Sequence, residues 1–265
     1  MEVRDKVFVV TGGGNGIGRA LVLNLLDKGA YVAAVDLNLK ALEETASLAN
    51  EQNKNLSLHV VNITDQSAVE ALPDAVIKKH KQVDAIINNA GIIQPFIDVK
   101  DLDYDRIRLV MDVNFYGTIY MIKSFLPHLL KRPKAHITNI SSMGGFVPVP
   151  GQSIYGASKA AVKLLTEGLY AELKGTSVGV TVVFPGGVGT NIMKNSDAEG
   201  SRMPKMDQDA QKMQLLTPEE AAEIIVQGTM KEKYRVLAGK DAKMLDKLTR
   251  LMPKKAAEVI AKKLR

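Results

Sequence analysis

The chain has 265 residues, 46% hydrophobic and 24% charged, which is the composition of one globular domain of ordinary to large size. It contains no cysteine, which excludes disulfides, thiolate metal sites and a cysteine nucleophile. No apolar run approaches the roughly 20 residues that a membrane span needs, and the N-terminus shows no secretory signal pattern, so we expect a cytoplasmic protein.

The formal net charge of +6 belongs to one end of the chain. Residues 240–265 hold nine Lys and Arg against three Asp and Glu, whereas the remaining 239 residues hold 26 of each sign. A nucleic-acid-binding protein spreads its positive charge over a folded face, so this distribution argues against nucleic acid as a partner.

Strand and helix patterns alternate from the N-terminus onward. Short β-branched apolar runs predict strands, and apolar residues at three- and four-residue spacing predict helices. In chain order we expect a strand at Val7–Val10, a helix at Ile17–Lys28, a strand at Tyr31–Val35, a helix at Leu39–Glu51, a strand at Leu56–Val61, a helix at Asp65–Lys79 and a strand at Val83–Ile87.

The alternation continues with longer helices. We expect a helix at Asp103–Leu130 with a kink around Gly117, a strand at Ala135–Asn139, a helix at Tyr155–Lys174, a strand at Val178–Phe184, a helix opened by the capping sequence Thr217-Pro218-Glu219-Glu220 and a strand at Tyr234–Leu237. The pattern predicts an α/β fold in which a doubly wound parallel sheet, flanked by helices, forms a single domain over residues 1–265.

Residues 240–265 form a basic C-terminal extension that is expected to be helical, with an interruption near Pro253. Apolar side chains recur at helical spacing between the lysines, at Met244, Leu245, Leu248, Leu251 and Met252. We expect this extension to dock on its own domain or on a partner subunit. A surface helix attracted to anionic lipid is the alternative.

A glycine-rich turn, Thr11-Gly-Gly-Gly-Asn-Gly-Ile-Gly18, joins the first expected strand to the first expected helix. Glycine permits a tight turn and close backbone approach to a pyrophosphate, and the helix N-terminus offers free N–H groups to it. At this position in a strand–helix–strand unit, the turn predicts a Rossmann-type dinucleotide site. A purely structural turn is the alternative.

Asp36 ends the second expected strand, 18 residues beyond Gly18. A carboxylate there can accept hydrogen bonds from the adenosine ribose hydroxyls, and it would repel a 2′-phosphate. No Arg or Lys stands at Asn15 or Leu37, where a phosphate clamp would be expected. The sequence therefore favours NAD over NADP as cofactor.

Tyr155 and Lys159 stand four residues apart and so share one face of a helix. A free tyrosine has a pKa near 10, and a neighbouring cation lowers it toward the range of a useful base. Ser142 follows a strand, 13 positions earlier, and could hold a substrate oxygen beside the phenol. Taken alone, such a pair is more often a solvated helix face.

The chain resembles the short-chain dehydrogenase/reductase family from its first strand to about Thr190. The matching pieces occur in order: Thr11-Gly12 with Gly16 and Gly18, Asn88-Asn89-Ala90-Gly91, Asn114, Ser142, Tyr155 with Lys159, and Pro185-Gly186 with Thr190. The resemblance implies an NAD-dependent alcohol dehydrogenase or carbonyl reductase that needs no metal. The four histidines, His59, His80, His128 and His136, show no ligand spacing.

The resemblance also implies a role for each matching residue. Tyr155 would be the general acid/base, Ser142 would orient the reacting oxygen, and Lys159 would lower the Tyr155 pKa and bind the nicotinamide ribose. Asn114 would hold a water that links Lys159 to solvent; a helix-kink residue is its alternative. The remaining cofactor contacts would be Gly12, Asn15, Gly16, Ile17, Gly18, Asp36, Asn62, Ile63, Asn89, Ala90, Gly91, Pro185, Gly186, Val188 and Thr190.

Two segments point to the substrate. Residues 190–216 fall where the family carries its substrate lid, and they include four of the eleven methionines. We expect a pocket for an apolar secondary alcohol or its ketone, lined by Met143, Phe146, Val147, Val149 and Met193. Packing of these residues on each other is the alternative.

The chain departs from the family pattern at two places. Asn62 stands where the family often has Asp, and the basic C-terminal extension replaces a short ending.

The resemblance also bears on assembly and on an alternative function. It favours a homodimer or homotetramer through helices 103–130 and 155–174. A non-catalytic NAD-binding regulator or scaffold is the alternative function; it would bind cofactor without turnover.

Overall fold

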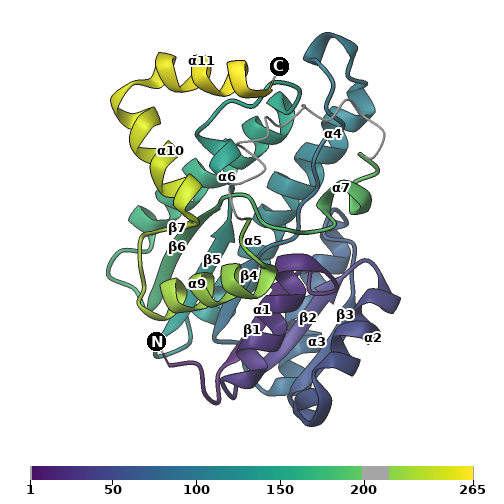
Figure 1. Ribbon diagram of the computed structural model, residues 1–265. Coiled ribbons are helices and arrows are strands. Elements are labelled where there is room, and N and C mark those ends of the chain that lie inside the picture. The colour runs from purple at the N-terminus through teal and green to yellow at the C-terminus, as the bar shows by residue number, and fades with distance from the viewer. Residues whose placement is uncertain (1, 199–214, 265) are drawn as a thin grey trace.

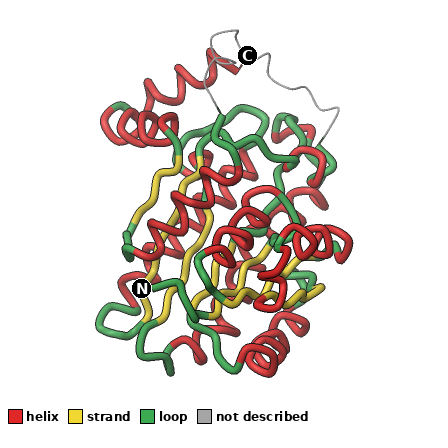
Figure 2. The backbone as a smooth tube through the Cα atoms, turned by 60° about the horizontal axis from the view of Figure 1, so that its bottom comes forward, coloured by secondary structure: helices red, strands yellow, loops and turns green. Residues whose placement is uncertain are grey.

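The computed structural model describes residues 2–198 and 215–264. Seven parallel strands form one sheet in the order β3-β2-β1-β4-β5-β6-β7, with helices on both sides (Figure 1, Figure 2). The strands are β1 (Val7–Thr11), β2 (Tyr31–Asp36), β3 (Leu56–Val60), β4 (Ala85–Asn88), β5 (Ala135–Ile140), β6 (Val178–Pro185) and β7 (Arg235–Ala238). The predicted doubly wound parallel sheet is confirmed.

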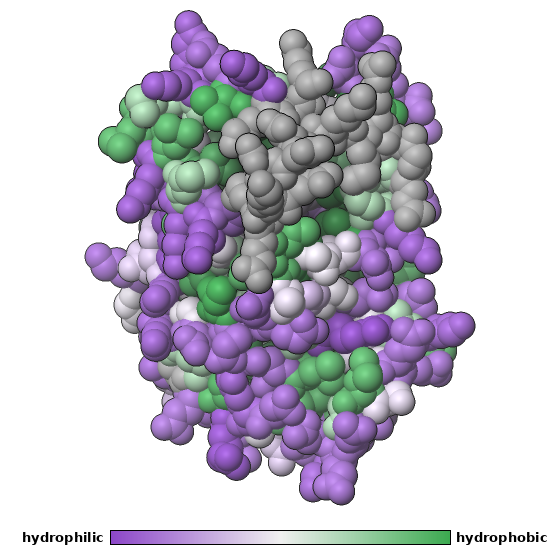
Figure 3. Space-filling model, viewed as in Figure 1, coloured by the Kyte–Doolittle hydropathy of each residue, from purple (hydrophilic) through white to green (hydrophobic). Residues whose placement is uncertain are grey.

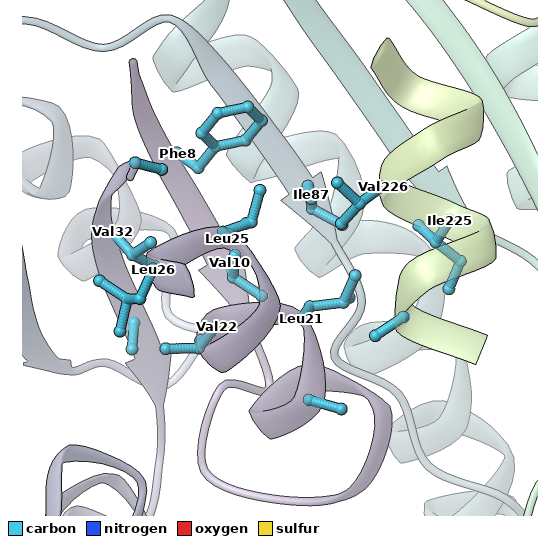
Figure 4. Packing of buried hydrophobic residues seen from close by; sticks show 14 of the residues in the cluster. Phe8, Val10, Leu21, Val22, Leu25, Leu26, Val32, Ile87, Ile225 and Val226 are labelled. Carbon is cyan, nitrogen blue, oxygen red and sulfur yellow. The ribbon is translucent and has the colours of Figure 1, made fainter. Parts of the chain in front are cut away.

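Two apolar layers hold the helices to the sheet. On one face lie α1 (Gly16–Asp27), α2 (Leu39–Leu48) and α9 (Pro218–Met230), and on the other lie α3 (Gln66–His80), α5 (Gly117–Leu129) and α6 (Ser153–Glu172). Figure 4 shows Leu21 and Leu25 of α1 beside Ile225 and Val226 of α9, packed against the sheet. Successive strand residues serve opposite layers, Phe8 the first and Val9 the second, because side chains alternate along a strand.

The long helix expected at Asp103–Leu130 is divided into three parts. It consists of α4 (Tyr104–Met111), a π-helical turn η3 (Asp112–Tyr116) and α5, so the irregularity precedes Gly117. The expected helix Leu39–Glu51 ends earlier, at Leu48, and a 3₁₀ segment η1 (Asn50–Asn55) follows it. Short 3₁₀ turns also occur at η2 (Val99–Asp101) and η4 (Met143–Gly145).

Helix α6 begins two residues before Tyr155, so Tyr155 lies in its first turn. The backbone N–H groups of a first turn have no partner within the helix. The helix therefore needs an acceptor from elsewhere in the fold.

The strand order places the functional site. It reverses between β1 and β4, which are paired neighbours although they lie far apart in the sequence. Ligands of open parallel sheets bind in the crevice outside the carboxyl ends of the strands at such a reversal. Thr11, Asp36, Asn88 and Pro185 all end strands at this edge.

Two helices follow the last strand. The capping box predicted at Thr217 is present at the start of α9, and α10 (Lys240–Leu251) and α11 (Pro253–Leu264) follow β7 with a break near Pro253, as expected. Figure 1 shows α10 rising from the β7 end of the sheet and α11 crossing the top of the molecule. In the described part of the chain, no helix has the length and apolar character needed to cross a membrane.

Candidate active site

A cleft of about 550 Å³ opens at the carboxyl edge of the sheet. It is large enough for a dinucleotide or a drug-sized ligand. Ser142 lines it, together with every expected cofactor contact except Gly18: Gly12, Asn15, Gly16, Ile17, Asp36, Asn62, Ile63, Asn89, Ala90, Gly91, Tyr155, Lys159, Pro185, Gly186, Val188 and Thr190. Residues as far apart in the sequence as Gly12 and Asn195 therefore share one cleft.

The glycine turn has the backbone that its sequence predicts. Gly12 and Gly16 have φ angles of +69° and +51°, in the left-handed region that favours glycine. Gly18 lies one layer behind the cleft: a Cβ there would come within 1.9 Å of the Gly12 carbonyl oxygen. Gly18 thus permits the close approach between the turn and α1 rather than a direct ligand contact.

Asp36 is held with its carboxylate at the cleft. Oδ2 accepts a hydrogen bond from the Gly14 N–H at 3.0 Å, and Oδ1 accepts one from the Asn38 N–H at 3.0 Å. Each oxygen has further lone pairs to offer. The neighbouring Leu37 also lines the cleft and is 67% exposed, so no cation stands beside the carboxylate at that position.

The loop after β4 is fastened to the glycine turn through Thr11. The Thr11 hydroxyl accepts hydrogen bonds from the N–H groups of Asn89 and Ala90, both at 3.0 Å. The Asn89 amide donates back to the Thr11 carbonyl at 3.0 Å. These bonds join the two loops on either side of the strand-order reversal and fix the floor of the cleft.

Ser142 and Tyr155 form the polar centre of the cleft. Ser142 caps η4, accepting a hydrogen bond from the Gly144 N–H at 3.0 Å. Burial raises the pKa of Tyr155, and a hydrogen bond with Ser142 acts in the opposite direction. At neutral pH the phenol therefore carries its proton.

Lys159 is 4% exposed and donates from Nζ to the Ile140 carbonyl at 3.0 Å. Burial lowers the pKa of Lys159 to about 8, because the charged form loses its hydration. The Lys159 ammonium thus hydrogen bonds to Ile140, while the pKa of Tyr155 responds to burial and to Ser142.

Asn114 lies in the π-helical turn and is fully buried. Its Oδ1 accepts from the Ile92 N–H at 2.8 Å, and its Nδ2 donates to the Ile92 carbonyl and to the Ser158 hydroxyl, both at 2.9 Å. A Cβ on Gly91 would come within 3.1 Å of Asn114 Oδ1 and 3.0 Å of Lys159 Nζ. Asn114 therefore joins the helix irregularity to the loop beside Lys159.

Two buried glutamines complete the first turn of α6, and neither was expected from the sequence. The Gln94 Oε1 accepts hydrogen bonds from the N–H groups of Ile154 at 2.8 Å and Tyr155 at 3.1 Å. Gln152 donates from Nε2 to the Gln94 carbonyl at 2.7 Å. Gln94 thus provides the acceptor that the start of α6 requires.

Asp241, in the C-terminal extension, contacts the Pro185–Val188 segment that lines the cleft. Its Oδ2 accepts a hydrogen bond from the Gly187 N–H at 2.7 Å. A Cβ on Gly186 would come within 2.0 Å of Asp241 Oδ1, so the turn must be glycine to receive the carboxylate. The first turn of α10 therefore supports the Pro185–Val188 segment of the cleft.

The residues expected to bind substrate do not appear among those that line the cleft. Phe146 packs edge-on against Phe184 with ring centroids 5.3 Å apart, and Val147 is 2% exposed. Met143 and Val149 are half-buried, and Met193 lies in the short helix α7 (Ile192–Asn195). The apolar side chains Ile92, Ile93 and Ile192 line the cleft instead.

The substrate lid expected at 190–216 is described only in part, because residues 199–214 lie outside the described residues.

Where the chain is described, no cluster of His, Cys, Asp or Glu is arranged to hold a metal ion. His136 is buried, and its Nε2 hydrogen bonds to the Thr181 hydroxyl at 2.8 Å, joining β5 to β6.

The sequence profile of the short chain dehydrogenase family matches residues 6–200 of this chain. The chain therefore belongs to the short-chain dehydrogenase family, and it is an oxidoreductase of that type with a Rossmann fold. The resemblance on which the expectations rest is confirmed at the level of the family.

One curated relative and two solved structures illustrate the match. The putative oxidoreductase SadH of Mycobacterium tuberculosis is 37% identical over 260 residues, which is 97% of this chain and 94% of that protein. A short chain dehydrogenase/reductase from Burkholderia phymatum in complex with NAD has a TM-score of 0.83 at 24% identity, covering 95% of this chain and 96% of that one. ElxO with NADP bound has a TM-score of 0.77 at 24% identity, covering 88% and 96%. Similar folds thus hold either dinucleotide.

Proposed function

We propose that this protein is an NAD-dependent oxidoreductase that interconverts an apolar secondary alcohol and its ketone. The observation that supports this proposal best is the convergence of Ser142, Tyr155 and Lys159 on one cleft with the glycine turn and Asp36. When bound, NAD accepts or NADH delivers the hydride. The protein's own residues orient the reacting oxygen and move its proton.

Tyr155 is the proposed proton donor and acceptor. A phenol with a raised pKa is protonated at neutral pH, which is the form required to give a proton to a carbonyl oxygen during reduction. In the oxidative direction Tyr155 would first have to release its own proton, and the resulting phenolate would receive the hydroxyl proton of the alcohol. The Ser142 hydroxyl, hydrogen-bonded to Tyr155, orients the substrate oxygen and stabilises its developing charge.

Lys159 and Asn114 are proposed to serve the same proton path. The buried ammonium of Lys159 would bind the nicotinamide ribose, and a pKa of about 8 would allow it to exchange protons near neutral pH. Asn114 would hold a water beside Lys159. Its side chain bonds to Ile92 and Ser158.

The preference for NAD rests on Asp36. Its carboxylate lines the cleft at the end of β2, and no Arg or Lys stands at Asn15 or Leu37 to bind a 2′-phosphate. The anion would accept hydrogen bonds from ribose hydroxyls and repel a phosphate. This supports NAD over NADP.

The proposed substrate class is supported by apolar side chains in the same cleft as Ser142. Ile92, Ile93 and Ile192 offer apolar contact, and Ile93 is 7% exposed. Burying an apolar substrate against such walls is favourable because it removes apolar surface from water. The polar side chains of Asn191 and Asn195 also line the cleft and could hydrogen bond to a polar group of the substrate.

The decisive experiment follows NADH absorbance while purified protein meets NAD, or separately NADP, and a panel of lipophilic secondary alcohols. We expect turnover with NAD and its loss in Tyr155→Phe, which keeps the ring but removes the hydroxyl. Binding of NADH without turnover on a broad panel would instead support the regulator or scaffold. Turnover with sugars or short polyols alone would refute the apolar substrate.

Assembly is proposed to be a homodimer or homotetramer in the cytoplasm. Both expected interface helices carry exposed apolar side chains. Leu164 on α6 is 69% exposed, and Tyr116 in η3 is 45% exposed. Apolar side chains on such faces favour contact with another subunit. Sedimentation velocity of the purified protein measures the assembly directly.

A further inference from the structure

The outward face of α10 combines free cations with exposed apolar side chains. Lys240, Lys243 and Lys247 are exposed, and within the described residues none of them takes part in an ion pair. Beside them, Met244 is 54% exposed, Leu251 is 79% exposed and Met252 is 43% exposed. We call these six residues the basic face.

Helical geometry places these residues together. Positions 240, 244, 247 and 251 follow each other at three- and four-residue steps and therefore share one side of α10. Ala242, Leu245 and Asp246 lie on the opposite side and are buried. Figure 3 shows apolar side chains gathered over α10 at the upper left, bordered by hydrophilic ones.

The acidic residues of α10 do not neutralise this face. Asp241 turns inward to the Gly187 N–H, and Asp246 is 8% exposed and binds Arg235 at 2.7 Å. Of the C-terminal acids only Glu258 is exposed, on α11 and 3.9 Å from Lys254. The outward potential of the extension is therefore positive.

We propose that the basic face is a docking site for an anionic phospholipid bilayer. Cations on such a face are attracted to acidic headgroups, while Leu and Met side chains enter the boundary of the acyl chains. Each observed feature has a role in that contact: the lysines are free, the apolar groups are exposed, and the acids are turned away.

A second copy of the chain fits the basic face less well. In a two-fold contact the same patch meets itself, so lysines would face lysines. The rest of the chain, residues 1–239, offers 26 acidic against 26 basic residues and so has no net charge to attract the face. Charge complementarity therefore favours the lipid surface.

The basic face lies on the helix whose first turn contacts the cleft. Because Asp241 in the first turn of α10 accepts a hydrogen bond from the Gly187 N–H, the docked helix would begin beside the Pro185–Val188 end of the cleft. A bilayer bound to α10 would then lie next to that end of the molecule. The lipid inference itself does not depend on the catalytic proposal.

Co-sedimentation with vesicles tests the proposal on the full-length protein. The probes are vesicles of phosphatidylcholine with phosphatidylglycerol and vesicles of phosphatidylcholine alone, each at low and high salt. We expect binding to the anionic vesicles at low salt and its loss at high salt, since salt screens surface charge. The variant Lys240→Gln/Lys243→Gln/Lys247→Gln should bind about 100-fold more weakly.

Two further variants make the result specific. Met244→Ser/Leu251→Ser should also weaken binding while it leaves the charge unchanged. Lys40→Gln/Lys54→Gln/Lys79→Gln removes the same charge from exposed positions elsewhere and should bind like the unaltered protein. Circular dichroism checks that each variant is folded.

Four outcomes would overturn the proposal. The unaltered protein could fail to bind anionic vesicles at low salt, or it could bind neutral vesicles equally well. The two lysine variants could bind alike. If sedimentation velocity shows that the basic-face variants alone dissociate an oligomer, the occupant is a second copy and the lipid proposal is wrong.

Discussion

Gln94 accepts a hydrogen bond from the backbone N–H of Tyr155 at 3.1 Å, across 61 residues of sequence. The same Oε1 accepts from Ile154, so one fully buried side chain satisfies two N–H groups at the start of α6. The position of the proposed acid/base thus depends on a loop that follows a different strand.

Replacing Gln94 with Ala should therefore lower activity and stability together. The variant leaves two partly buried N–H groups without an acceptor, which costs about 1–3 kcal/mol in the free energy of unfolding. Urea unfolding measures that loss, and amide hydrogen exchange should quicken at Ile154 and Tyr155. Gln94→Glu keeps an acceptor and should retain slow exchange at both amides, whereas Gln66→Ala at an exposed glutamine controls for a general effect. Unchanged exchange in Gln94→Ala would contradict the capping role.

Asp36 should control the choice of cofactor. In Asp36→Ala, the ribose loses a charged acceptor and Gly14 loses its partner, so the Kd for NADH should rise about 10- to 100-fold. Asp36→Asn keeps an acceptor and removes the charge, so its main effect should be tighter binding of NADPH. Fluorescence titration with both reduced cofactors measures these changes. A variant that binds NADPH no better than the unaltered protein would count against charge repulsion as the cause.

The buried ammonium of Lys159 should make the stability of the cofactor-free protein rise with pH. The folded pKa is about 8, against an ordinary value of 10.5, so between these values the unfolded chain binds one more proton. The free energy of unfolding then increases by about 3 kcal/mol as the pH rises through this window. Comparing the Tm at both ends of the window, with Lys159→Met as the reference, isolates this group. The Lys159→Met variant should show a smaller rise of Tm with pH. An equal rise in both proteins would contradict the assignment to Lys159.

Asp241 should couple the C-terminal extension to cofactor binding. Asp241→Ala removes the acceptor of the Gly187 N–H, so the Pro185–Val188 segment loses its support and the KM for cofactor should rise several-fold. Asp241→Asn keeps an acceptor and should have a smaller effect. Asp74→Ala, an exposed acid on α3, serves as a control for an unrelated change of charge. Identical KM values for the Ala variant and the unaltered protein would show that the bond has no effect on the cofactor end.

Local patterns in the sequence determined the sheet, the glycine turn and the residues proposed to transfer the proton. Alternating apolar runs and helical spacing depend on neighbours along the chain, so strands such as Val7–Thr11 could be predicted within a residue or so. Ser142, Tyr155 and Lys159 belong to spacings that the family shares. The helix end at Leu48 and the π-helical turn were less predictable, because packing of neighbouring elements decides where a helix ends or loosens.

Only the tertiary structure decided which distant groups complete the site. Gln94 reaches Tyr155 and Asp241 reaches Gly187 because loops from different strands meet at the carboxyl edge of the sheet, and no local spacing encodes such a meeting. The same holds for the proposed substrate wall, where Ile92 and Ile192 line the cleft while Phe146 packs on Phe184. The sequence gives the positions of the apolar residues. The path of the backbone determines whether each apolar side chain faces a ligand or the core.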